Sequence, residues 1–164
     1  MKILGIDPGT ATTGWAVTEK KDGAEIKAIA YGHISTQPQD SDWKRLKEIT
    51  QDIKEIIHTH KPDEAAVESL FFFKNVKTAM TVSQARGAIL LAITQEEVPL
   101  YEYTPLQIKQ ALTGYGQATK KQVQSMVQRL LKLEKPPTPD DTADAIAITI
   151  CHHQSRKLQS LLNK

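Results

Sequence analysis

The stretch that decides the fold is KILGIDPGT, residues 2–10. Its first five residues are mostly apolar, which is typical of a buried β-strand. Pro8 and Gly9 are turn residues, so they end that strand. Asp7 therefore stands at the end of the strand, and α/β folds usually place their functional side chains at such an edge of the sheet.

Two further strands follow at short intervals. Residues 13–18 resume a strand pattern, and residues 25–35 alternate between apolar and polar side chains. Residues 21–23, between these two segments, have the composition of a hairpin turn. Because tight turns join neighbouring antiparallel strands, the sequence predicts a three-strand antiparallel meander.

The apolar period changes after Pro38, where apolar residues begin to recur at helical spacing. We expect helices over residues 43–57, 77–95, 105–112, 120–131 and 140–153, and short strands over 65–67 and 100–103. This order predicts an α/β fold, in which one mixed sheet joins the meander to parallel strands and carries helices on both faces.

The length favours one domain with a substantial core. We expect this domain to span residues 3–153 and to be followed by a short polar C-terminal tail, 154–164, that frays. Trp43, Met80 and Met126 lie on helical apolar stripes, and the sequence predicts that all three belong to the core.

Composition limits the class of protein. Of the 164 residues, 40% are hydrophobic and 24% charged, as in an ordinary globular domain. The net charge of +2 does not identify a nucleic-acid binder, so a DNA-binding surface must come from local clusters of Lys and Arg. The single cysteine, Cys151, excludes an intramolecular disulfide and suits a reducing cytoplasm. With no signal peptide or long apolar run, we expect a cytoplasmic protein without a membrane segment.

Four acidic residues occupy similar positions. Asp7 and Glu68 each end an apolar strand, while Asp141 and Asp144 share one face at the start of the last predicted helix. Three of them have an ordinary alternative role. Asp7 fits an Asx turn, Glu68 a solvated strand end, and Asp141 the third position of a capping box that Thr138 begins.

Together these carboxylates favour a site for hard divalent cations, which take oxygen ligands. Two Mg²⁺ ions about 3.5–4 Å apart would activate an attacking water and stabilise the leaving oxygen of a phosphoryl transfer. The chain offers neither a Cys/His set for zinc nor a nucleophile elbow for a Ser/His/Asp triad. The acids therefore indicate magnesium-dependent phosphoryl transfer, with Mn²⁺ as an alternative ion.

A series of short motifs runs along nearly the whole chain. They are ILGIDPGT (3–10), TGW (13–15), AVE (66–68) leading to Phe71 and Lys74-Asn75, SQARG (83–87), YEY (101–103), KQ (109–110), GYG (114–116), KQVQ (121–124) and DTADAIAI (141–148). Each motif alone has little specificity. In this order they closely resemble the RuvC-type Holliday junction resolvases, the crossover junction endodeoxyribonucleases of bacteria.

The resemblance implies a ribonuclease H-like fold and a homodimer that cleaves opposing strands of four-way DNA junctions, leaving 5′-phosphate and 3′-hydroxyl ends. It also implies that Asp7, Glu68, Asp141 and Asp144 are the catalytic, metal-binding acids of a two-metal mechanism. A branch-migration complex of the RuvA and RuvB type is the protein partner that the family suggests. Helix 77–95 has small residues that suit close packing in the dimer, namely Ala79, Ala85, Ala88 and Ala92.

DNA contacts are expected from one aromatic and several basic residues. Phe71, Phe72 and Phe73 cannot all face one side of an element, and an exposed ring stacks on bases with about 1–3 kcal/mol. By its place in the motif, Phe71 is the predicted wedge between DNA bases. In the alternative, which stays open, two of the three rings pack into the core or the dimer interface. The predicted phosphate contacts, each also readable as an ordinary surface residue, are Lys74, Lys77, Arg86, Lys109, Lys120 and Lys121.

Two other functions fit part of the sequence. Asp-x-Gly-Thr after a strand also resembles the first phosphate loop of sugar kinases and actin-like ATPases. Those proteins need a second comparable domain and a later Asp-Gly-Gly loop, which this chain lacks. A junction-binding protein without cleavage is the other alternative, and the presence of all four acids argues against it.

Overall fold

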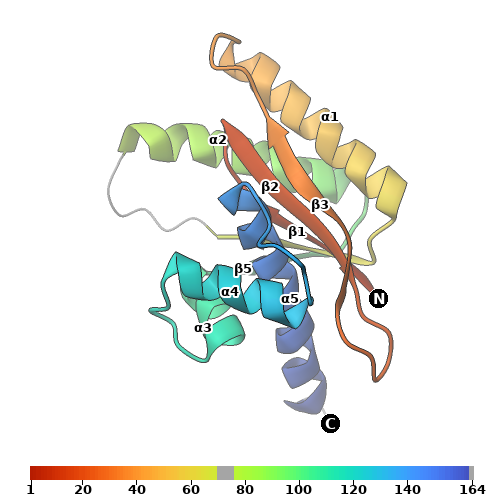
Figure 1. The fold of residues 1–164 in the computed structure, drawn as a ribbon. Helices are drawn as coiled ribbons and strands as arrows, with labels where there is room; N and C mark the ends of the chain where they lie inside the picture. Colours follow the sequence, from red (N-terminus) through yellow and green to blue (C-terminus); the bar gives the residue numbers. More distant parts are fainter. Residues whose placement is uncertain (70–75, 163–164) are drawn as a thin grey trace.

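A five-stranded mixed sheet forms the centre of the molecule, with strand order β3-β2-β1-β4-β5 (Figure 1). The computed structural model describes residues 1–69 and 76–162, with side chains described for 1–69 and 79–156. The strands are β1 (Lys2–Asp7), β2 (Thr12–Glu19), β3 (Lys27–Ser35), β4 (Glu64–Glu68) and β5 (Leu100–Tyr103). β1, β2 and β3 pair antiparallel, whereas β4 lies parallel to both β1 and β5. The predicted meander and the predicted mixed sheet are therefore confirmed.

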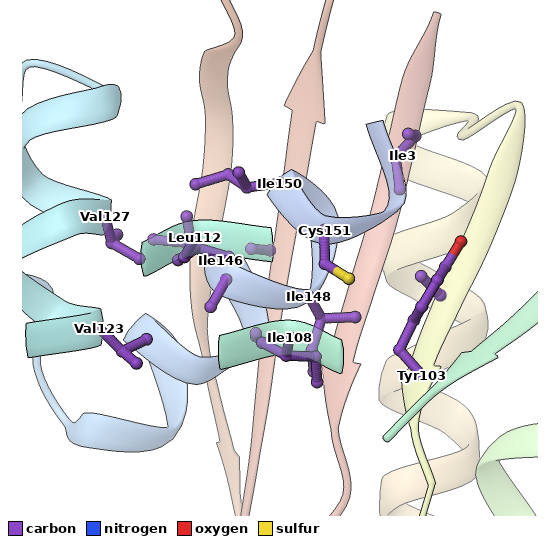
Figure 2. Packing of buried hydrophobic residues seen from close by; sticks show 14 of the residues in the cluster. Ile3, Tyr103, Ile108, Leu112, Val123, Val127, Ile146, Ile148, Ile150 and Cys151 are labelled. Atoms are coloured by element: carbon purple, nitrogen blue, oxygen red, sulfur yellow. The ribbon is translucent and has the colours of Figure 1, made fainter. Parts of the chain in front are cut away.

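Helices cover both faces of this sheet. They are α1 (Asp42–His60), α2 (Val76–Gln95), α3 (Pro105–Thr113), α4 (Lys120–Leu130) and α5 (Asp140–Leu162). α1 and α2 pack on one face through an apolar cluster that includes Leu4 and Ile6. α3, α4 and α5 pack on the other face through a second cluster that includes Ile3 (Figure 2). Neighbouring residues of β1 thus enter different cores, which explains the continuous apolar run in this strand.

α5 lies directly on β1 and β2 because these strands carry glycine where the helix crosses them. A Cβ added to Gly5 would overlap the carbonyl oxygen of Ala145, and one added to Gly14 would overlap that of Asp141. Larger side chains at either position would push the helix away from the sheet. The two glycines therefore set the distance between the helix that carries the C-terminal acids and the strand that ends in Asp7.

α5 extends to Leu162, beyond the end that the sequence predicted at residue 153. Contacts of two side chains with Glu64, one buried and one half-exposed, hold this part of the helix. Nε2 of His152 lies 2.7 Å from the carboxylate of Glu64 at the start of β4, and a guanidinium nitrogen of Arg156 lies 2.7 Å from the same carboxylate. The helix thus crosses the predicted boundary between domain and tail, and the division into 3–153 and 154–164 stays a prediction. α5 begins at Asp140, so Thr138 is not the residue before its first turn.

Two of the three predicted assignments to the core are wrong. Trp43 is 78% exposed and Met80 is 64% exposed, whereas Met126 packs against the core as expected. The buried residues of α1 begin only at Ile49, so the first turn of that helix extends past the sheet. Within the described part of the chain, no helix is long and apolar enough to cross a membrane.

Candidate active site

Asp7 and Glu68 lie side by side at one edge of the sheet. Asp7 is the last residue of β1 and Glu68 the last residue of β4, and the parallel pairing of these strands ends one residue earlier, at Ile6 and Val67. The two carboxyl groups lie close enough to form a hydrogen bond with each other. Two carboxylates this close repel each other, which favours a proton or a cation between them.

The first turns of α5 bring two more acids to this edge. Asp7 pairs across the strands with Gly14, and the backbone of Asp141 packs on Gly14. Asp144 lies one turn further along α5, on the same side of the helix as Asp141. Both residues are half-buried, and the charges of both act on Asp7. The predicted convergence of the four acids is therefore present in the structure.

Burial and mutual repulsion dominate the electrostatics of this cluster. Burial, followed by the charges of Glu68, Asp144 and Asp141, raises the pKa of Asp7 to about 8. Burial and then the charge of Asp144 raise the pKa of Glu68 above its usual value. Burial also raises the pKa of Asp144. Carboxyl groups in this state are stabilised by protons or by a cation placed among them.

Two lysines from the neighbouring helices oppose this charge. Lys120 opens α4, and its Nζ lies 3.0 Å from Oδ2 of Asp144 and 3.5 Å from Oδ2 of Asp140. A capping box between Thr119 and Gln122 fixes the start of this helix. Lys109 on α3 is half-buried, and its charge, like that of Lys120, offsets part of the rise in the pKa of Glu68. Both lysines therefore border the acids, whereas Lys121 is exposed next to Lys120.

The donor set fits a hard divalent cation, because it consists of carboxylate oxygens with raised pKa values. As they stand, however, no three His, Cys, Asp or Glu side chains in the described residues are arranged to hold an ion. The ammonium group of Lys120, beside Asp144, offsets part of the negative charge of the cluster. A bound cation would compete with protons and with this ammonium group for the carboxylate oxygens.

Arg86 lies at this site in a way that the sequence did not indicate. Its side chain is only 19% exposed and forms an ion pair with Glu102 of β5. Its Nε donates a hydrogen bond to the backbone carbonyl oxygen of Glu68, at 3.3 Å. The guanidinium group is thus directed at the end of β4, whereas the sequence predicted a contact with DNA.

A second unpredicted network holds the turn after Asp7. The Thr36 hydroxyl donates to the carbonyl oxygen of Thr10 at 2.7 Å, and Nε of Arg45 donates to that hydroxyl at 2.8 Å. The Thr10 hydroxyl donates to the carbonyl oxygen of Thr81 in α2 at 2.8 Å. These contacts join residues far apart in the chain, so no local sequence pattern marks them.

Three predicted DNA-binding residues lie where the structure gives no side-chain description. Phe71 and Lys74 lie outside the described residues. Lys77 belongs to the first turn of α2, but its side chain is also outside the described part. Their predicted roles therefore stay predictions.

The chain matches one protein family over almost its whole length. A sequence model described as Crossover junction endodeoxyribonuclease RuvC matches residues 3–152. The RuvC protein of Petrotoga mobilis is 55% identical over 157 residues, which is 96% of either chain. That of Halothermothrix orenii is 54% identical over 158 residues, 96% of this chain and 95% of its own.

Solved structures give the same result. The structure of Thermus thermophilus RuvC is 35% identical, covers 97% of both chains and has a TM-score of 0.88. A structure of T. thermophilus RuvC in complex with Holliday junction substrate has a TM-score of 0.91 at 35% identity, covering 97% of this chain and 96% of that one. The predicted ribonuclease H-like fold is confirmed. With sequence and fold both matched over nearly their full length, the chain belongs to the RuvC family of crossover junction endodeoxyribonucleases.

Proposed function

We propose that this chain resolves four-way DNA junctions by hydrolysing one phosphodiester bond in each of two opposing strands. The observation that carries the proposal is the cluster of Asp7, Glu68 and Asp144 at the sheet edge, bordered by Lys109 and Lys120. Such a cluster joins acids that suit metal binding to cations that suit phosphate. The junction complex of the T. thermophilus relative supports the choice of substrate.

The four acids share one proposed role. Asp7, Glu68, Asp141 and Asp144 are the catalytic residues and the ligands of two Mg²⁺ ions, for which Mn²⁺ can substitute. When bound, these ions would activate the attacking water and stabilise the leaving oxygen, leaving 5′-phosphate and 3′-hydroxyl ends. The raised pKa values support the role of the acids, since crowded carboxylates gain most from a nearby cation.

The basic residues around the acids are proposed to hold the DNA backbone. Lys109 and Lys120 border the cluster, and Lys121 stands exposed beside Lys120. In this arrangement they neutralise phosphates next to the cleaved bond without reading sequence. Phe71, as a wedge between bases, and Lys74 and Lys77, as further phosphate contacts, complete the proposed DNA surface.

A homodimer is proposed to form through the exposed face of α2. Met80 is 64% exposed and Leu91 57% exposed, and with exposed Gln84 and Gly87 they form one stripe along the helix. A Cβ at Gly87 would meet nothing within 4 Å, so the stripe leaves room for close approach of a second helix. This revises the interface expected from the sequence, because Ala85 and Ala92 are buried within their own core. The dimer would bring two active sites to one junction.

The cellular setting is a proposal of the same kind. We infer action in the cytoplasm, where chromosomal junctions form, alongside a branch-migration complex of the RuvA and RuvB type. The family relationship supports both inferences.

A nicking assay tests the proposed function. The purified chain is incubated with Mg²⁺ and either a mobile four-way junction or a linear duplex of the same sequence, with EDTA as the metal-free control. We expect paired nicks in opposing strands of the junction only, and we expect ligase to seal them because the ends are 5′-phosphate and 3′-hydroxyl. Junction binding without nicking would instead support the non-cleaving alternative.

A further inference from the structure

Arg86 ties helix α2 to the ends of two strands. Its Nε donates to the carbonyl oxygen of Glu68 at 3.3 Å, and a terminal nitrogen of its guanidinium forms an ion pair with Glu102. Glu102 lies on β5 opposite Val67 of β4. One side chain from α2 thus contacts both strands. Its partner on β4 is Glu68, whose carboxyl group lies beside that of Asp7.

The place of this contact matters because Glu68 is the last residue of its strand. The pairing of β4 with β1 stops at Val67, so no strand pair with β1 extends to Glu68. On the other side, Glu68 pairs with Tyr103, and the Ser69 amide donates to the Tyr103 carbonyl oxygen at 2.8 Å. The hydrogen bond from Arg86 adds a further contact that holds this strand end in place.

The state of the guanidinium group favours an internal role over a DNA contact. The Arg86 side chain is 19% exposed, whereas its partner Glu102 is 48% exposed. Burial lowers the pKa of Arg86, which reflects its removal from water. Two of its nitrogens are already committed to protein oxygens, and a contact with phosphate would have to compete with them.

We propose that Arg86 is a positioning residue that fixes the backbone of Glu68, and with it the carboxyl group beside Asp7, instead of binding DNA. This inference rests on the proposed function, because it concerns the same acid site. Loss of the hydrogen bond lets the end of β4 fray, so Glu68 occupies its place beside Asp7 for a smaller fraction of the time. Residues that contact and orient metal ligands without touching the metal typically contribute about 10–100-fold to metal affinity or activity.

Two substitutions test the positioning role. Arg86→Gln removes the charge and the fork of donors, while Arg86→Lys keeps the charge and can reach one partner. In Arg86→Gln we expect about tenfold weaker Mn²⁺ binding to the DNA-free protein, followed by electron paramagnetic resonance, and faster hydrogen exchange of the Ser69 amide. We expect a similar rise in the Mg²⁺ concentration for half-maximal nicking, with metal-free junction affinity within about twofold of wild type. Arg86→Lys should recover part of each effect.

A matched control removes a different polar contact of α2, at its other end. Glu96, just beyond the helix, lies 3.4 Å from Nζ of Lys54 and 2.6 Å from Nε2 of His58, both on α1. Glu96→Gln should weaken α2 at its far end and leave Mn²⁺ binding and Ser69 exchange unchanged. Glu102→Gln, which leaves Arg86 in place, should shift both in the direction of Arg86→Gln and covers the case in which that variant does not fold.

The alternatives give different patterns. If Arg86 contacts DNA, Arg86→Gln weakens junction binding and lowers its salt dependence, while Mn²⁺ binding and Ser69 exchange match wild type, and the proposal is overturned. If the wild-type chain nicks no junction, the proposed function fails. The Mn²⁺ and exchange measurements on the free protein still decide the role of Arg86 in that case.

Discussion

The ammonium group of Lys120 lies 3.0 Å from Oδ2 of Asp144, among carboxyl groups whose pKa values are raised. This lysine supplies part of the positive charge that the crowded acids require. The same lysine is a proposed phosphate contact. Lys120 therefore has two partners, an acid of the cluster and, as proposed, a DNA phosphate.

This double role predicts opposite effects of Lys120→Gln on two measurements. Mn²⁺ should bind about three- to fivefold more tightly to the DNA-free variant, the scale of one half-exposed ion pair. Nicking should fall, because a phosphate contact is lost. Lys121→Gln, a change at the exposed neighbouring lysine, is the control and should leave Mn²⁺ affinity unchanged. Equal Mn²⁺ affinities for wild type and Lys120→Gln would show that this lysine does not compete with the metal.

The raised pKa of Asp7 predicts how stability depends on pH without metal. Burial and neighbouring acids raise the pKa of Asp7 from 3.8 to about 8, so the folded state keeps a proton that the unfolded chain has lost. The resulting stabilisation is complete below about pH 4 and disappears as the pH rises through 8. Within this window the free energy of unfolding falls by at most about 1.4 kcal/mol per pH unit for this group.

Urea unfolding in EDTA between pH 5 and pH 8 measures this slope. Asp7→Asn removes the titrating group, so its stability should fall less steeply with pH than that of wild type. Saturating Mg²⁺ should also offset the loss at high pH, because an ion that binds only the folded state stabilises it. Identical slopes for wild type and Asp7→Asn would refute the raised pKa.

Close packing of α5 predicts a strong effect of Gly14→Ala. The added Cβ would overlap the carbonyl oxygen of Asp141, so the helix must shift and the acids separate. We expect a loss of about 1–3 kcal/mol in the free energy of unfolding, together with loss of nicking. The control is Gly32→Ala, on the opposite face of the sheet, where the Cβ meets the Trp15 ring at 3.3 Å. Because this side chain can move, we expect the control to lose less stability than Gly14→Ala. Equal stability of Gly14→Ala and wild type would contradict this packing.

The proposed dimer predicts that a charge on the outer face of α2 separates the two copies. Leu91→Lys should sediment as a monomer and lose the coupling between nicks in opposing strands. Leu106→Lys is a matched control, because Leu106 is a similarly exposed leucine, at 62%, on α3. Sedimentation velocity distinguishes the two. A Leu91→Lys protein that remains dimeric would place the interface elsewhere.

Sequence reasoning could group the four acids because each has a local signal. Asp7 and Glu68 follow apolar strands, and Asp141 and Asp144 have helical spacing. Parallel strands carry their ends to the same edge of a sheet, so strand order alone brings the first two together. The matching family motifs then supplied the substrate, which carboxylate spacing cannot specify.

The features that sequence reasoning missed depend on contacts between distant segments. Arg86 looked like any surface cation, and only the fold places it beneath Glu68 and beside Glu102. The end of α5 was set too early, since its last turns are polar and Arg156 finds its partner, Glu64, 92 residues away. Trp43 shares the spacing of the helical stripe, but the first turn of α1 extends past the sheet, so spacing alone misassigned it.

We propose that Asp7 serves the chemistry of cleavage and not the binding of DNA. The most direct test compares Asp7→Asn with wild type on a four-way junction, measuring nicking in Mg²⁺ and the dissociation constant without metal. We expect nicking to fall by about 10²–10³-fold or more, with junction binding kept or slightly tightened because one buried acid no longer repels phosphate. Nicking at the wild-type rate, or loss of binding together with nicking, would contradict it.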